Sequence, residues 1–195
     1  MDTALSIIIP AYNEEDNVLP LYGELKEVLE GLSRPFEIIF VDDGSRDATF
    51  LTLESIHQKD KRVKVIKFRK NFGQSAALKA GFDQASGNIL ITMDSDLQND
   101  PHDIPALIGT MEKDDFDVIC GWRYCRQDSP SKKIFSRLAN SLRRYITRET
   151  IHDSGCTLRS YRKECVQDLE LHGELHRYIP AILQWKGYRV GELRV

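Results

Sequence analysis

Short apolar runs rich in isoleucine and valine recur along the chain, and amphipathic stretches separate them. Such runs, bounded by turn residues, are typical of strands buried on both faces of a parallel sheet. The stretches at about 14–31, 46–59, 73–86 and 101–114 have helical spacing and helix start signals. This β-α-β-α order predicts an α/β fold with a doubly wound, mostly parallel sheet flanked by helices. The predicted strands are LSIII (5–9), FEIIFV (36–41), VKVIKF (63–68), NILITM (88–93) and DVICG (117–121).

A polar cluster follows each of the first four predicted strands. Ligands of open α/β sheets bind beyond the carboxyl ends of the strands, where neighbouring loops converge. We therefore expect a functional site at this edge of the sheet. The clusters are PAYNEE (10–15), DDGSRD (42–47), RKNFGQS (69–75) and DSDLQND (94–100).

Two carboxylates one residue apart, Asp94 and Asp96, follow the fourth run. Like charges this close repel and resist burial unless a cation lies between them. At a strand end, residues i and i+2 point to the same side, so the pair could share one ion, and Gln98 adds a neutral oxygen nearby. Oxygen ligands with open positions for substrate phosphates favour Mg²⁺ or Mn²⁺. Asp100, which precedes Pro101, is better explained as a helix cap.

The DDGSRD cluster has two interpretations. Asp42 and Asp43 could accept hydrogen bonds from the base or the ribose of a nucleoside. The same letters also encode a turn at Gly44 followed by a helix cap at Ser45 or Asp47. Both interpretations can hold together.

The PAYNEE cluster is equally open. Tyr12 could pack along a base and Glu14 could face a ribose, whereas Asn13 alone would explain the stretch as a helix cap. Taken singly, the cap is the simpler explanation.

Residues 131–147 are predicted to form a basic amphipathic helix. The segment SKKIFSRLANSLRRYI (131–146) has apolar residues at helical spacing, and 131–148 contains six Lys or Arg residues and no acid. Such a helix suits an anionic membrane surface or a phosphate-bearing partner. A core helix with a solvated basic face would have the same pattern.

Composition excludes several classes of protein. The cysteines, Cys120, Cys125, Cys156 and Cys165, form no Cys-x-x-Cys pair, which argues against structural zinc and against a disulfide framework. We expect a reducing compartment. The chain has neither the pattern of a signal peptide nor a run of about 20 apolar residues, so we expect that it neither crosses a membrane nor is exported. With a net charge of -3 and its basic residues gathered in one helix, a nucleic-acid partner is not expected.

Four ordered motifs carry a resemblance to a known family. The segments IIIPAYNEEDNV, EIIFVDDGSRDAT, KNFGQSAALKAGFDQASGNILITMDSDLQNDP and DSGCTLRSYR resemble family 2 glycosyltransferases of the GT-A fold. Within that family the chain looks most like the dolichyl-phosphate mannose synthase and polyprenyl-phosphate glycosyltransferase branch. The resemblance implies one catalytic domain over 1–195, with a nucleotide-sugar half (1–121) and an acceptor half (122–195). Relatives continue beyond the position of Val195, so we expect a truncated C-terminal segment.

The resemblance also implies roles for individual residues. Asp153, in HDSGC, would be catalytic or would orient the sugar or the acceptor, although a turn beside Gly155 explains it as well. Arg177 would bind phosphate, unless it is a surface arginine. The implied positions are Pro10, Tyr12, Glu14, Asp42 and Asp94 for the donor nucleotide; Asp94, Asp96 and Gln98 for the metal; Asp94, Asp96 and Asp153 for catalysis; and Arg123, Arg137, Ser141 and Arg177 for the acceptor phosphate.

The implied reaction is inverting transfer of a hexose from a nucleotide-diphospho sugar to a polyprenyl or dolichyl phosphate at the cytoplasmic face of a membrane. GDP-mannose is the first expected donor and UDP-glucose the second. A phosphatase with an aspartate nucleophile would have its Asp-x-Asp after the first strand, and no Gly-x-Gly-x-x-Gly or P-loop supports a dinucleotide or P-loop enzyme. A sugar-nucleotide-binding module without turnover remains an alternative.

Overall fold

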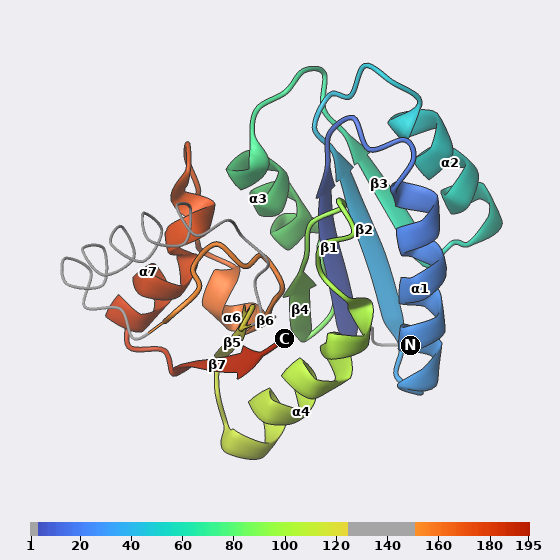
Figure 1. Ribbon diagram of the computed structural model, residues 1–195. Coiled ribbons are helices and arrows are strands. Elements are labelled where there is room, and N and C mark those ends of the chain that lie inside the picture. The colour runs from blue at the N-terminus through green and yellow to red at the C-terminus, as the bar shows by residue number, and fades with distance from the viewer. Residues whose placement is uncertain (1–3, 125–150) are drawn as a thin grey trace.

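The computed structural model describes residues 4–124 and 151–195, which form one seven-stranded sheet with helices on both faces (Figure 1). The strand order is β3-β2-β1-β4-β6-β5-β7, and only β6 runs against its neighbours. The sheet therefore runs through both predicted halves of the chain. The strands are β1 (Leu5–Ala11), β2 (Phe36–Asp42), β3 (Val63–Lys67), β4 (Ile89–Thr92), β5 (Val118–Trp122), β6 (Arg159–Arg162) and β7 (Val190–Arg194).

The helices divide between the two faces of the sheet. One apolar core joins α1, α2 and α4 to the sheet, and a second core joins α3, α6 and α7 to the other face. The helices are α1 (Val18–Gly31), α2 (Thr49–Lys59), α3 (Gln74–Gln84), η1 (Pro101–Asp103), α4 (Ile104–Asp114), α6 (Lys163–Val166), η2 (Leu175–Tyr178) and α7 (Ile179–Trp185).

Burial on both faces explains the continuous apolar runs. Successive side chains of a strand point to opposite faces, so Ile7 and Ile9 enter the first core while Ile8 enters the second. The five predicted strands and four predicted helical stretches are confirmed, although α1 and α2 begin later than predicted. The antiparallel strand β6 was not predicted, because its short sequence, RSYR, has no apolar run.

No helix in the described ranges is long and apolar enough to cross a membrane. The predicted basic helix, 131–147, lies outside the described residues.

Glu37 is a buried carboxylate in β2 and supplies a test of the fold. Its Oε1 accepts hydrogen bonds from Ser6 Oγ (2.7 Å) and Ser86 N (2.6 Å), and Lys64 Nζ lies 2.6 Å from Oε2. Burial opposes the charge, but the hydrogen bonds from Lys64, Ser6 and Ser86 outweigh it and lower the pKa of Glu37 below its usual value.

We expect Glu37→Gln to lower the free energy of unfolding at pH 7 by about 1–3 kcal/mol, because charge-assisted hydrogen bonds are lost while Lys64 stays partly exposed. A lowered folded-state pKa contributes stability above the unfolded-state pKa and loses it as the pH falls through the folded-state value. The difference between the two proteins should therefore shrink in denaturant titrations repeated from pH 7 into the acid range. A constant difference would assign the cost to packing instead of charge.

Candidate functional site

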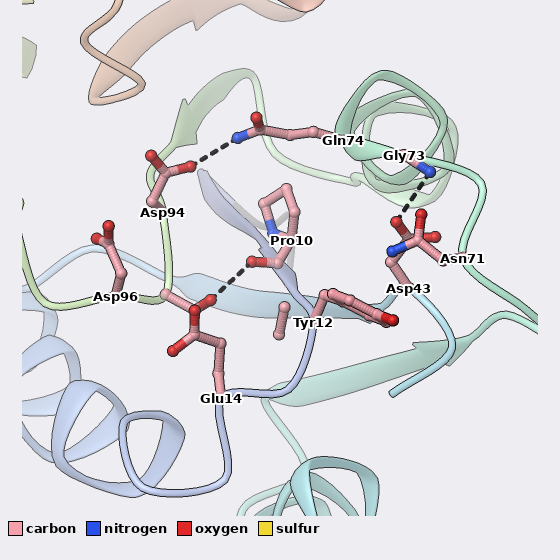
Figure 2. Close-up of a pocket in the computed structure, with 11 residues that line it drawn as sticks. Pro10, Tyr12, Glu14, Asp43, Asn71, Gly73, Gln74, Asp94 and Asp96 are labelled. Atoms are coloured by element: carbon pink, nitrogen blue, oxygen red, sulfur yellow. Dashed lines mark hydrogen bonds between the residues drawn. The ribbon is translucent and has the colours of Figure 1, made fainter. Parts of the chain in front are cut away.

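A pocket of about 300 Å³ lies where the carboxyl ends of β1, β2 and β4 meet the start of α3 (Figure 2). Three polar clusters predicted from the sequence converge in it, and the Asp43 carboxylate of a fourth reaches its wall. A polar pocket therefore lies at the edge of the sheet where the sequence predicts a site. The lining comprises Pro10, Ala11, Tyr12 and Glu14; Asp43; Asn71, Gly73 and Gln74; and Asp94, Ser95 and Asp96.

Asp94 and Asp96 both line the pocket, but not as the end of a strand. β4 ends at Thr92, two residues before Asp94, so the two carboxylates share a side because of the loop and not because of strand pleating. Ser95 Oγ donates to the carbonyl of Pro10 at 3.0 Å, which fixes this loop against β1. The Gln98 backbone N–H donates to Asp96 Oδ1 at 3.1 Å, and the Gln98 side chain is exposed and not among those that line the pocket.

The donor set suits a divalent cation. The pKa of Asp94 is raised, first by burial and then by the charge of Asp96, so a positive charge between them would relieve both penalties. In the parts of the chain that the structure describes, no group of three or more His, Cys, Asp or Glu side chains is placed to hold a metal. Two carboxylates with open positions for phosphate oxygens are the arrangement that Mg²⁺ commonly adopts.

The two aspartates at the end of β2 have separate surroundings: Asp42 is the last residue of the strand and Asp43 follows it. Asp42 is fully buried, and its Oδ1 accepts from Ser45 N at 3.0 Å; within the described ranges its Oδ2 has no hydrogen-bond partner. Asp43 reaches the pocket wall, and its oxygens accept from the N–H groups of Phe72 (2.7 Å) and Gly73 (2.9 Å). Asp43 therefore holds the β3–α3 loop in place. The predicted turn at Gly44 is confirmed by its φ of 74°.

The loops after β1 and β2 bind each other. Asn13 N donates to Ser45 Oγ (3.0 Å), Arg46 N donates to Asn13 Oδ1 (2.9 Å), and Glu14 N donates to Thr49 Oγ1 (2.8 Å). Asn13 is therefore a bridge between loops and not the cap of α1, whose N-cap is Asn17. These bonds hold the backbone that carries the pocket side chains Tyr12 and Glu14.

Tyr12 and Glu14 both line the pocket. Tyr12 is 40% exposed, and Glu14 Oε2 accepts from Asn17 Nδ2 at 2.6 Å. The exposed ring of Tyr12 and the carboxylate of Glu14 at the same pocket are compatible with the predicted contacts to a base and a ribose. The cap predicted at Asp100 is confirmed, because its side chain accepts from His102 N at the start of η1.

Arg123, a predicted ligand of the acceptor phosphate, and Asp153, a predicted catalytic or orienting residue, are bound to each other. Arg123 Nε lies 2.9 Å from Asp153 Oδ2, and a terminal nitrogen lies 3.2 Å from Oδ1. Burial opposes the guanidinium charge, but the bonds to Asp153 outweigh it and raise the pKa of Arg123. Asp153 Oδ1 also accepts from Gly155 N at 3.1 Å, so the turn beside Gly155 is present too.

This ion pair lies close enough to the pocket for the charge of Arg123 to stabilise ionised Asp94. The structure describes one of the other three predicted phosphate ligands. Arg177 on η2 is exposed and pairs with Glu174 at 3.2 Å, whereas Arg137 and Ser141 lie outside the described residues.

The polar side chains of Asn71 and Gln74 line the pocket and were not among the predicted site residues. Gln74 begins α3, and its Nε2 donates to Asp94 Oδ1 at 2.6 Å (Figure 2). The available signal was positional: both residues belong to RKNFGQS, the polar cluster after the third predicted strand.

A model of the family described as glycosyl transferase family 2 matches residues 6–170. The chain belongs to glycosyltransferase family 2. Dodecaprenyl-phosphate galacturonate synthase of Rhizobium johnstonii is 39% identical over 195 residues, which cover 98% of this chain and 58% of that protein. Undecaprenyl-phosphate 4-deoxy-4-formamido-L-arabinose transferase of Pseudomonas aeruginosa is 37% identical over 192 residues, covering 98% and 56% respectively. The chain thus spans somewhat more than half the length of these family 2 relatives.

Solved structures support the same assignment of fold. Glucosyl-3-phosphoglycerate synthase from Mycobacterium tuberculosis, in complex with Mn²⁺, uridine diphosphate and phosphoglyceric acid, matches with a TM-score of 0.75 at 17% identity. The match covers 98% of this chain and 68% of that one. The predicted GT-A fold and the predicted family are confirmed, and both named relatives act on polyprenyl phosphates, as the predicted branch does.

Proposed function

We propose that this protein transfers a sugar from a nucleotide-diphospho sugar to a polyprenyl phosphate. The observation that carries the proposal is the convergence of Asp94 and Asp96 with Tyr12 and Glu14 on one pocket, with Arg123 close by. Membership of family 2 and the two polyprenyl-phosphate relatives support the same reaction. A polyprenyl phosphate is a membrane lipid, so we also propose that the protein acts at a membrane surface, on its cytoplasmic face.

The donor half of the reaction needs stabilisation of a leaving group. Tyr12 and Glu14 would orient the nucleoside, and Asp94 and Asp96 would hold a divalent cation beside the diphosphate. When bound, Mg²⁺ or Mn²⁺ would stabilise the negative charge that develops on the departing diphosphate. The two carboxylates themselves would act by holding the positive charge of the cation in a fixed place.

The acceptor half needs positioning more than deprotonation. A phosphate monoester has a second pKa of about 6 and is already ionised at neutral pH. Arg123 has five N–H donors, and its two hydrogen bonds to Asp153 leave others for a phosphate. We therefore assign Asp153 to the orientation of Arg123, because a carboxylate paired with a guanidinium is a poor base. Attack from the face opposite the diphosphate would invert the configuration of the sugar.

We also propose which nucleotide the sugar donor carries. The resemblance made GDP-mannose the first expected donor and UDP-glucose the second. The two named relatives transfer galacturonate and 4-deoxy-4-formamido-L-arabinose and not mannose, which weighs against GDP-mannose as the donor. We therefore place a UDP-sugar first and keep GDP-mannose as the alternative.

Isothermal titration calorimetry with UDP, GDP, UDP-glucose, UDP-galacturonate and GDP-mannose, each with Mn²⁺ and with a chelator, tests this directly. We expect metal-dependent binding of the uridine series, and transfer of radiolabelled sugar to undecaprenyl phosphate in detergent. Binding of the guanosine series alone would reverse the choice of donor. Binding without transfer to any polyprenyl phosphate would favour a sugar-nucleotide-binding module.

A further inference from the structure

Asp94 accepts a hydrogen bond from one neutral side chain and has the hydroxyl of a second nearby, and the two come from distant parts of the chain. The Gln74 amide at the start of α3 donates to Asp94 Oδ1 at 2.6 Å. The Thr157 hydroxyl, which precedes β6, lies near enough to the Asp94 carboxylate to oppose the rise in its pKa. We call Gln74 and Thr157 the Asp94 clamp.

The bond that Thr157 accepts from Asn99 decides what its hydroxyl can offer to Asp94. Asn99 Nδ2 donates to Thr157 Oγ1 at 3.1 Å, so the oxygen acts there as an acceptor. A hydroxyl has one proton, and that of Thr157 is therefore available to donate to Asp94. Asn99 is itself buried, so this donor is held in a fixed place.

Both members of the clamp are anchored by further contacts. Just before Gln74, the N–H groups of Phe72 and Gly73 donate to Asp43, and just after it Ser75 Oγ lies 2.9 Å from His176 Nδ1. On the other side, the carbonyl of Thr157 accepts from Thr92 Oγ1 in β4 at 2.7 Å. The clamp is thus held by the sheet and by α3 and not by a flexible loop.

Neutral hydrogen-bond donors leave the negative charge of Asp94 in place, whereas a cationic partner would offset it. Asp153 is already paired with a guanidinium, which offsets its charge. Gln74 and Thr157 fix the orientation of Asp94 and leave its negative charge available for a cation. Groups that orient metal ligands in this way typically change metal affinity by 10- to 100-fold when they are removed.

We propose that Gln74 and Thr157 are positioning residues, which hold Asp94 in the orientation that binds a divalent cation and the donor diphosphate. This inference rests on the proposed function, because it needs Asp94 to be a metal ligand. It adds two residues to the site, from α3 and from the segment before β6, that the resemblance to family 2 did not supply.

The test measures Mn²⁺ binding by electron paramagnetic resonance of the free ion, with and without UDP or GDP. We expect Gln74→Ala and Thr157→Val each to raise the dissociation constant for Mn²⁺ about 10- to 100-fold. Gln84→Ala, at the exposed end of the same helix, should leave it unchanged, and Thr157→Ser, which keeps the hydroxyl, should restore most of the affinity.

A double-mutant cycle separates positioning from a general structural effect. In an Asp94→Asn background, Gln74→Ala should weaken Mn²⁺ binding no further, because the residue it orients is no longer a charged ligand. An equal loss in both backgrounds, or Mn²⁺ affinity within about twofold of wild type for both clamp variants, would overturn the inference alone. Failure of the wild-type protein to bind Mn²⁺ with either nucleotide would overturn the proposed donor site and this inference together.

Discussion

Replacing Asp96 with asparagine is expected to reduce sugar transfer by about 100- to 1,000-fold, the range observed when one preorganised charge-stabilising group is removed from an active site. Asparagine has nearly the same shape, and its side-chain oxygen can still accept the hydrogen bond from Gln98 N that Asp96 Oδ1 accepts now. The variant therefore removes a charge and preserves the loop. Initial rates at saturating Mn²⁺ and donor, together with the Mn²⁺ dissociation constant, measure the effect.

Asp100 provides the matched control in the same segment. It is exposed, does not line the pocket, and accepts from His102 N as the cap of η1. Asp100→Ala should cost about 0.5–2 kcal/mol of stability through loss of the cap and leave the transfer rate near wild type. If the Asp96 variant kept full activity, or if both variants lost activity equally, the two-carboxylate metal site would be wrong.

The second large effect concerns Gly44, whose substitution by alanine is expected to lower the free energy of unfolding by about 2–4 kcal/mol. Gly44 has a φ of 74°, which costs a residue with a Cβ about 1–2 kcal/mol. An added Cβ would also lie 2.4 Å from the carbonyl carbon of Lys70 and 2.7 Å from Asn71 N, so backbone would have to move. For a chain of this length the melting temperature should fall by about 5–15 °C.

The same displacement would reach the pocket, because the contacted loop carries Asn71 and leads into Gln74. Nucleotide binding should therefore weaken even below the melting temperature. Gly109→Ala is the control: Gly109 lies on an exposed face of α4, an added Cβ meets no atom within 4 Å, and alanine should stabilise the helix by about 0.5–1 kcal/mol. Equal melting temperatures for the Gly44 variant and wild type would contradict the close approach of the two loops.

Side-chain periodicity accounts for the parts of the fold that could be predicted. LSIII and FEIIFV are continuously apolar because both faces of β1 and β2 are buried, and that requirement is visible in the residues themselves. β6 had no such signal: it lies between β4 and β5 in the sheet, although it follows them in the chain. Its place is decided by pairing with strands that are about 40 and 70 residues earlier in the chain.

The features of the site also divide into those that the sequence predicted and those that it did not. The polar clusters and their order along the chain pointed to Asp94, Asp96, Tyr12 and Glu14, because residues at the carboxyl ends of parallel strands must meet at one edge. The sequence alone thus determined the α/β class, the edge that carries the pocket and the membership of glycosyltransferase family 2.

Only the tertiary structure decided which polar groups bind which. Arg123 pairs with Asp153 across 30 residues, Gln74 with Asp94 across 20, and Asp43 with the N–H groups of Phe72 and Gly73 across 29 and 30. Hydrogen bonds require donors and acceptors about 3 Å apart in a fixed direction, and that geometry is set by how the loops pack. No local pattern records it: the sequence left open a nucleoside contact at Asp43, and the structure shows that this carboxylate holds the pocket loop in place.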